Sequence, residues 1–106
     1  VQTTNAAGRA DFDTCFPGWY PGRAIHIHFT VAAGPFAYTS QLFFEQGLVD
    51  AVFAGHPEYV PFGAPDRPNA SDGVVDRATR EALTVAAMPM PDGALLAWQD
   101  LVLDLA

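Results

Sequence analysis

The chain has 106 residues, of which 50% are apolar and 12% aromatic, so it can bury one modest hydrophobic core. Its net charge of −7, with no lysine and five scattered arginines, argues against nucleic-acid binding, which needs clustered basic side chains. No apolar run approaches the length of a membrane span, so no membrane partner is expected.

The N-terminal part predicts one turn and one strand. Residues 5–8, NAAG, have the composition of a turn. Residues 9–16 alternate loosely between apolar and polar side chains, which is typical of a strand. The single cysteine, Cys15, allows no internal disulfide and is expected to be a small buried side chain.

Residues 17–29, PGWYPGRAIHIHF, begin as a turn and end as a strand. Two Pro-Gly pairs predict the turn, and the β-branched and aromatic residues from Ile25 onwards predict the strand. Side chains alternate along a strand, so His26 and His28 should point to the same face. The phenol of Tyr20 can fold back from the turn towards them. These three side chains are therefore candidate ligands of one metal ion.

Each of these residues also has a purely structural interpretation. A histidine in a strand is often only hydrogen-bonded, Tyr20 alone is a half-buried aromatic, and Arg23 alone is a surface charge paired with a carboxylate. The combination favours a metal site. Histidine nitrogen with phenol oxygen, and no carboxylate or thiolate nearby, suits a hard ion such as Fe(III).

The remaining elements are predicted to be mainly strands. Residues 38–44 should pair antiparallel with residues 25–31, and residues 48–54 should form a helical turn or two. The connection over residues 55–72 contains four prolines and should be irregular, with His56 exposed and not a ligand.

The C-terminal part allows two interpretations around residue 80. A helix is one alternative, but a strand over residues 83–88 is preferred, followed by a turn at residues 91–93 and a strand over residues 95–105. The expected fold class is therefore all-β, an antiparallel β-sandwich with one short helix.

Two stretches of the chain carry a resemblance to a known family. The run PGWYPGRAIHIHF, followed by YTSQLFF at residues 38–44, resembles the intradiol ring-cleavage dioxygenases. These include the protocatechuate and catechol dioxygenases and a looser group of often secreted relatives. The resemblance is strong over residues 12–44 and weaker over residues 56–59 and 66–73. It implies that residues 1–106 form the C-terminal part of a catalytic β-sandwich domain that is incomplete at its N-terminus.

The resemblance also implies a site and a reaction. In the family, a non-haem Fe(III) is held by two tyrosinates and two histidines. Tyr20 matches the tyrosinate that leaves the metal when substrate binds, and His26 and His28 match the histidines. Arg23 matches an arginine that stabilises negative charge on the substrate, and Gln41 matches a glutamine facing the same pocket. The implied reaction belongs to aromatic compound catabolism: a catechol-type diol is cleaved with O₂ between its two hydroxyl-bearing carbons.

The chain departs from the family at the first tyrosinate, which should lie upstream of Val1. Neither Tyr38 nor Tyr59 matches it. Two functions therefore stay open: an oxygenase, whole or in part, and a non-catalytic β-module that keeps the pocket and acts in metal binding or assembly. The resemblance leaves three explanations open for the missing tyrosinate: a fragment, a processed product, or a shortened relative whose missing half comes from another chain. Each would leave strand edges exposed, which favours pairing with a second copy or a partner chain.

Overall fold

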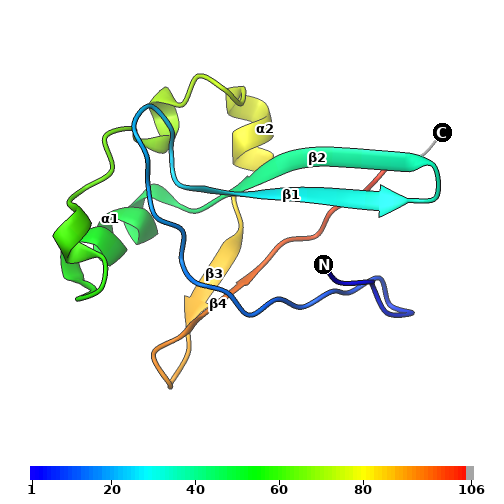
Figure 1. The fold of residues 1–106 in the computed structure, drawn as a ribbon, viewed down its shortest axis with the longest axis horizontal. Coiled ribbons are helices and arrows are strands. Elements are labelled where there is room, and N and C mark those ends of the chain that lie inside the picture. The colour runs from blue at the N-terminus through cyan, green and yellow to red at the C-terminus, as the bar shows by residue number, and fades with distance from the viewer. Residues whose placement is uncertain (105–106) are drawn as a thin grey trace.

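Two antiparallel hairpins form the β-structure of the protein. The computed structural model describes residues 1–104. Strands β1 (His26–Ala33) and β2 (Phe36–Phe43) form the longer hairpin, and β3 (Ala86–Pro89) and β4 (Leu95–Trp98) form the shorter one (Figure 1). The pairing predicted between residues 25–31 and 38–44 is confirmed.

The register of the longer hairpin positions the candidate site. Ala33 pairs with Phe36, so only Gly34 and Pro35 form the turn, and Gly34 takes a φ of +58° that glycine adopts without steric cost. Counting back along the ladder places His28 opposite Gln41. Paired residues share a face of the sheet, so Gln41 lies on the face that carries the histidines.

Helices cover one end of this hairpin. Helix α1 (Gln46–Gly55) confirms the helical turns predicted over residues 48–54, and it buries Val49 and Phe53, which lie one turn apart. Helix α2 (Arg77–Ala82) is capped at its N-terminus by Asp76, whose carboxylate accepts a hydrogen bond from the Thr79 N–H at 3.1 Å. Two 3₁₀-helices, Val60–Phe62 and Asn69–Ser71, interrupt the otherwise irregular connection. No described helix is long and apolar enough to cross a membrane.

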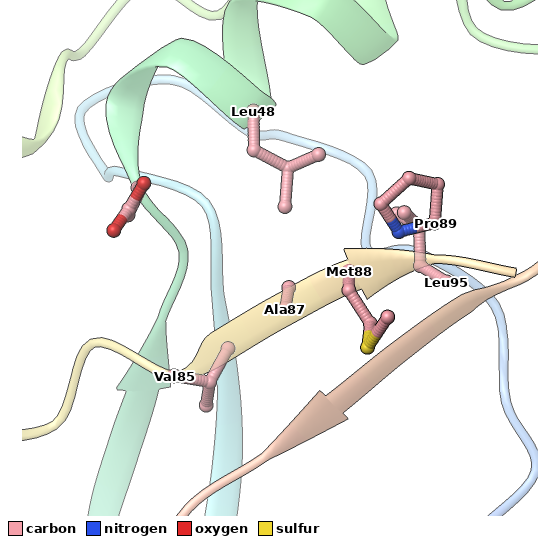
Figure 2. Close-up of a pocket in the computed structure, with 7 residues that line it drawn as sticks. Leu48, Val85, Ala87, Met88, Pro89 and Leu95 are labelled. Carbon is pink, nitrogen blue, oxygen red and sulfur yellow. The ribbon is translucent and has the colours of Figure 1, made fainter.

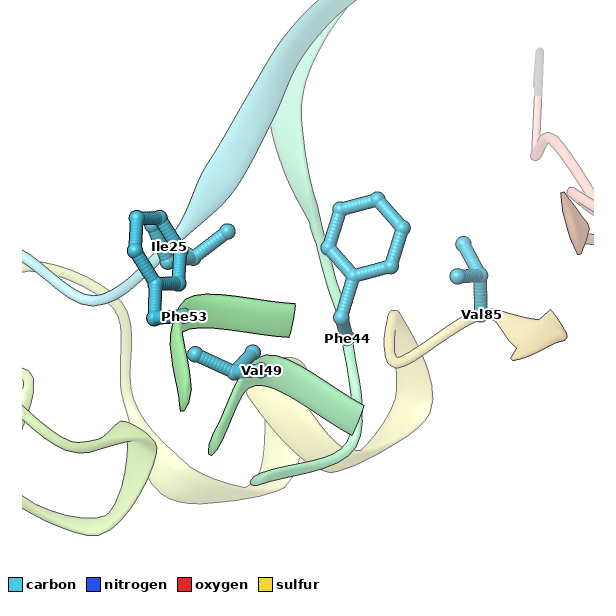
Figure 3. Packing of buried hydrophobic residues seen from close by; sticks show 5 residues of the cluster. All are labelled: Ile25, Phe44, Val49, Phe53 and Val85. Carbon is cyan, nitrogen blue, oxygen red and sulfur yellow. The ribbon is translucent and has the colours of Figure 1, made fainter. Parts of the chain in front are cut away.

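One hydrophobic core joins the two hairpins to α1. Its buried members come from α1 and from the residues just before β1, just after β2 and just before β3 (Figure 3): Ile25, Phe44, Val49, Phe53 and Val85. A parallel bridge ties the end of β2 to that last segment, because the Phe43 N–H donates to Leu83 O at 2.9 Å and the Val85 N–H donates to Phe43 O at 2.8 Å. The backbone around Ile25 is therefore fixed by packing immediately before His26.

The N-terminal segment differs from its prediction. The turn at residues 5–8 is confirmed, since Asn5 Oδ1 accepts from the Ala7 N–H at 2.9 Å. Residues 9–16 form no strand, and Cys15 is exposed, so both of those predictions are wrong. The physical reason is that no strand of either sheet pairs with this segment. Only its last residue reaches the core, where the Phe16 ring packs 4.7 Å from that of Phe44.

The C-terminal part contains both alternatives, one after the other. Residues 77–82 are helix, and the preferred strand begins only at Ala86. The turn predicted at residues 91–93 is confirmed by the Met90 N–H, which donates to Ala94 O at 2.8 Å, and by Gly93 at φ +90°. Strand β4 ends at Trp98, well short of the predicted residue 105, which lies outside the described residues. The fold is thus antiparallel β-structure in two sheets with helices, which confirms the coarser part of the expectation.

Candidate metal and substrate site

Tyr20, His26 and His28 lie together beside the start of β1. Tyr20 Oη is 3.3 Å from His26 Nε2, and the two rings meet edge-on with centroids 5.7 Å apart. The imidazole centroids of His26 and His28 are 5.2 Å apart. The turn at residues 20–23 brings the phenol back, with the Arg23 N–H 3.4 Å from Tyr20 O and Gly22 at φ +85°. The Tyr20 hydroxyl and His26 Nε2 therefore face each other, with the His28 ring beside that of His26.

His26 is held in the form that binds metals. Its Nδ1 lies 2.7 Å from Ala24 O, and a carbonyl can only accept, so Nδ1 carries the proton and Nε2 keeps its lone pair towards Tyr20. Burial lowers the pKa of His26, and the neighbouring Arg23 guanidinium and His28 imidazole lower it further. The hydrogen bond to Ala24 and the Asp72 carboxylate oppose this without reversing it. The ring is therefore neutral near pH 7.

A chain of polar contacts runs from His28 to Asp72. Gln41 is a buried residue, 8% exposed. Its side-chain amide donates from Nε2 to His28 Nε2 at 2.9 Å and accepts on Oε1 from Arg23 Nη2. Arg23 Nε donates to Asp72 Oδ2 at 3.0 Å, and its Nη1 lies 3.5 Å from Tyr20 Oη. Arg23 thus pairs with a buried carboxylate and contacts Tyr20 and Gln41, so its interpretation as a surface charge is wrong.

Asp72 is the residue that sequence reasoning did not single out. Its side chain is fully buried, and Oδ2 accepts from the Ala24 N–H at 2.8 Å as well as from Arg23. Oδ1 accepts from Val74 N–H at 3.0 Å and Val75 N–H at 3.4 Å. The only signals were an Asp-Gly pair, which is typical of a turn, and the weaker part of the resemblance.

These contacts predict a pH dependence of stability. Burial alone would raise the pKa of Asp72, but the backbone N–H groups of Ala24 and Val74 and the Arg23 guanidinium lower it to about 2, from an ordinary 3.8. A carboxyl whose pKa is lower in the folded than in the unfolded protein stabilises the fold at pH values above its unfolded-state pKa. That stabilisation is lost as the pH falls through the folded-state pKa. At about 1.4 kcal/mol per pKa unit, Asp72 should contribute roughly 2 kcal/mol, lost between about pH 4 and pH 2.

Urea unfolding at a series of acid pH values measures this contribution. Asp72→Asn should flatten the fall of the unfolding free energy over that interval. Glu58→Gln removes the same charge at an exposed position and serves as the control. An unchanged pH profile in Asp72→Asn would contradict the assignment of the low pKa to this carboxyl.

The donor set fits Fe(III), with one adjustment. Two ligand atoms about 2.1 Å from one ion and at right angles lie about 3 Å apart, close to the 3.3 Å between Tyr20 Oη and His26 Nε2. A neutral His26 keeps its Nε2 lone pair available to a metal ion. His28 Nε2 accepts from Gln41 in this conformation, so coordination through that nitrogen requires the Gln41 amide to rotate.

The phenol is essential to any metal site of this kind. Among residues 1–104, no group of three or more His, Cys, Asp or Glu side chains is arranged to hold a metal ion. Neither of the other tyrosines joins the site. Tyr38 packs against Phe29 on the opposite face of the hairpin, with centroids 6.0 Å apart, and the Tyr59 hydroxyl donates to Phe16 O at 2.6 Å. The third histidine, His56, is exposed, as predicted.

A small apolar cavity lies elsewhere, between α1 and the β3–β4 hairpin (Figure 2). Its volume is about 80 Å³. The lining includes the side chains labelled in the figure: Leu48, Val85, Ala87, Met88, Pro89 and Leu95. Glu45 is the only charged residue among those that line it, so the cavity lacks the convergent polar groups of a catalytic pocket.

Comparison with family models, with curated proteins and with solved structures found no match to this chain. The assignment of a function therefore rests on the residues of the site and on their geometry.

Proposed function

We propose that this chain carries the Fe(III) site of an intradiol dioxygenase, which uses O₂ to cleave a catechol-type aromatic diol. The observation that carries the proposal is the proximity of three side chains: Tyr20 Oη lies 3.3 Å from His26 Nε2, and the rings of His26 and His28 are 5.2 Å apart. Arg23 contacts Tyr20, and Gln41 contacts His28 and Arg23. Tyr20, His26 and His28 would hold the metal, and Arg23 and Gln41 would face the substrate.

Fe(III), when bound, supplies the Lewis acidity that keeps phenolic oxygens ionised near neutral pH, where a free tyrosine with a pKa of about 10 is protonated. Tyr20 can then act as a proton acceptor. Tyr20 is 52% exposed and sits on a turn, so its side chain would have room to swing away and keep a proton taken from a diol hydroxyl. His26, fixed through Nδ1, stays in place.

Arg23 supplies a permanent positive charge beside the position of the diol oxygens. Its side chain is only 11% exposed, so water screens that charge weakly. A guanidinium repels a metal cation, so it does not help to hold one. It does stabilise an anion that binds at the same site. Charge that develops on the diol during attack by O₂ would be stabilised by a donor that needs no rearrangement.

The proposal includes the finer fold expectation, a β-sandwich. Two-stranded hairpins are marginal by themselves, and the sandwich of the resembled family would give both hairpins neighbouring strands. In that arrangement, the first tyrosinate would come from strands upstream of this sequence or from another chain. Residues 1–106 would then be the C-terminal part of the domain.

Metal analysis, a visible spectrum and product analysis together test the function. The protein loaded with Fe(III) should bind one iron per chain and be red-brown through tyrosinate-to-iron charge transfer. With catechol and ¹⁸O₂ it should form a ring-opened dicarboxylic acid that contains both labelled atoms, since the reaction adds O₂ to the diol with no other product. A colourless, iron-free protein would overturn the proposal.

One observation favours the alternative of a non-catalytic assembly module. In the β3–β4 hairpin, Met88 pairs with Leu96 and Ala86 with Trp98, so these side chains share a face of the sheet, and the three large ones are exposed. Such apolar faces are typical of association surfaces. If this function is the correct one, the protein should bind iron without oxidising catechol and should self-associate in sedimentation experiments.

A further inference from the structure

We infer that Asp72 is a positioning residue that directs the guanidinium of Arg23 at Tyr20 and Gln41. The expected effect of Asp72 on the rate of ring cleavage rests on the proposed function. Its role in orienting the Arg23 side chain does not. It concerns a carboxylate 49 residues away from Arg23 in the sequence, on the connection that precedes α2.

The geometry of the ion pair carries the inference. A carboxylate that binds arginine with both oxygens uses two guanidinium nitrogens and leaves fewer for other partners. Asp72 uses one oxygen, Oδ2, for Arg23 Nε at 3.0 Å. Its other oxygen is occupied by the N–H groups of Val74 and Val75. Both terminal nitrogens of Arg23 are therefore left to face Tyr20 Oη and Gln41 Oε1.

The same oxygen also fixes the backbone of the site. Oδ2 accepts from the Ala24 N–H at 2.8 Å, so one atom holds both the Arg23 side chain and the peptide that follows it. Asp72 is itself held by Arg80, a buried side chain whose Nη1 donates to Asp72 O at 3.3 Å and Val75 O at 3.1 Å. Rotation of Arg23 away from the site would break a buried ion pair, which is strongly unfavourable.

A purely structural role for Asp72 predicts different behaviour. Asp66 provides the comparison, because it tethers the same connection to the same turn: Asp66 Oδ1 accepts from the Gly22 N–H at 3.2 Å. Within residues 1–104, Asp66 forms no hydrogen bond or ion pair with Arg23, whereas Asp72 does. If anchoring of the connection were all that mattered, Asp66→Ala and Asp72→Ala would have similar effects.

The first test needs neither metal nor activity. In ¹H–¹⁵N NMR spectra of the metal-free protein, the Arg23 Nε–H should exchange slowly with water, because its acceptor is buried. That protection should be lost in Asp72→Ala and kept in Asp66→Ala. Asp72→Asn, which preserves the shape of the side chain, replaces Asp72→Ala if the latter does not fold, and the same loss is expected. An Arg23 Nε–H that stays protected without the Asp72 carboxylate would overturn the inference.

The second test is a double-mutant cycle on the iron-loaded protein. Asp72→Asn should keep its iron and lower the rate of ring cleavage roughly tenfold or more. If Asp72 acts through Arg23, adding Asp72→Asn to Arg23→Ala should lower the rate no further. Independent, multiplying effects would overturn the inference. A wild-type protein without turnover would refute the proposed function instead, and the NMR result would still decide whether Asp72 holds Arg23.

Discussion

Replacing His26 and His28 together by alanine should abolish the binding of Fe(III) by this protein. Imidazole nitrogen supplies two of the three proposed ligand atoms, and Tyr20 alone cannot form a stable iron site. His26→Ala also removes the ring that is oriented by the Ala24 carbonyl and is therefore ready to bind. Iron content per chain, measured after loading and gel filtration, should fall from about one to about zero.

His56→Ala is the matched control for this experiment. His56 is the remaining histidine of the chain, and it lies exposed after α1, where its Nδ1 accepts from the Glu58 N–H at 3.3 Å. The control should keep its iron and its red-brown colour. Iron retained in full by the double variant, or lost equally from the control, would show that the metal binds somewhere other than at Tyr20, His26 and His28.

The longer hairpin and the shared face of its histidines could be predicted because both depend on local rules. Alternation along a strand places His26 and His28 together, and the turn at Gly34 and Pro35 fixes the register of the hairpin. Gln41 then lies opposite His28 without any further assumption. In this part of the chain, propensity, pattern and turn chemistry all indicate the same structure.

Asp72 could not be predicted in this way, because its role depends on contacts across 49 residues of sequence. An aspartate before a glycine is typical of a turn whether its carboxylate faces solvent or is buried against an arginine. Nothing local distinguishes the two cases. The burial of Asp72 follows from where the connection after α1 crosses the turn at Tyr20, which is a property of the whole fold.

The segment over residues 9–16 illustrates the opposite error. Loose alternation was interpreted as a strand, but a strand needs a neighbour to accept its backbone hydrogen bonds, and the described sheets provide none. Helix α2 was only the less favoured of two alternatives, because the β-branched Thr84 and Val85 just beyond the helix favour a strand. Its start signal is Asp76, whose carboxylate accepts from the Thr79 N–H.

Replacing Arg23 by alanine should leave iron bound and lower the rate of ring cleavage by roughly one to three powers of ten. The guanidinium repels a metal cation, so its loss should not weaken iron binding. What is lost is a positive charge, 11% exposed and fixed by Asp72, beside the oxygens of the substrate. A group preorganised in this way stabilises charge that develops during the reaction more than it stabilises the bound diol, so kcat should fall more than KM rises.

Two further variants separate this role from a general loss of positive charge. Arg23→Lys keeps the charge but cannot contact Asp72, Tyr20 and Gln41 at once, so it should recover only part of the rate. Arg77→Ala removes an exposed arginine whose partner is Glu81 at 2.9 Å, and it should turn over at the wild-type rate. Arg23→Ala with normal turnover, or with its iron lost, would contradict the assignment. If Arg23→Lys turned over at the wild-type rate, the positive charge alone would matter. The orientation that Asp72 imposes on the guanidinium would then have no effect on catalysis.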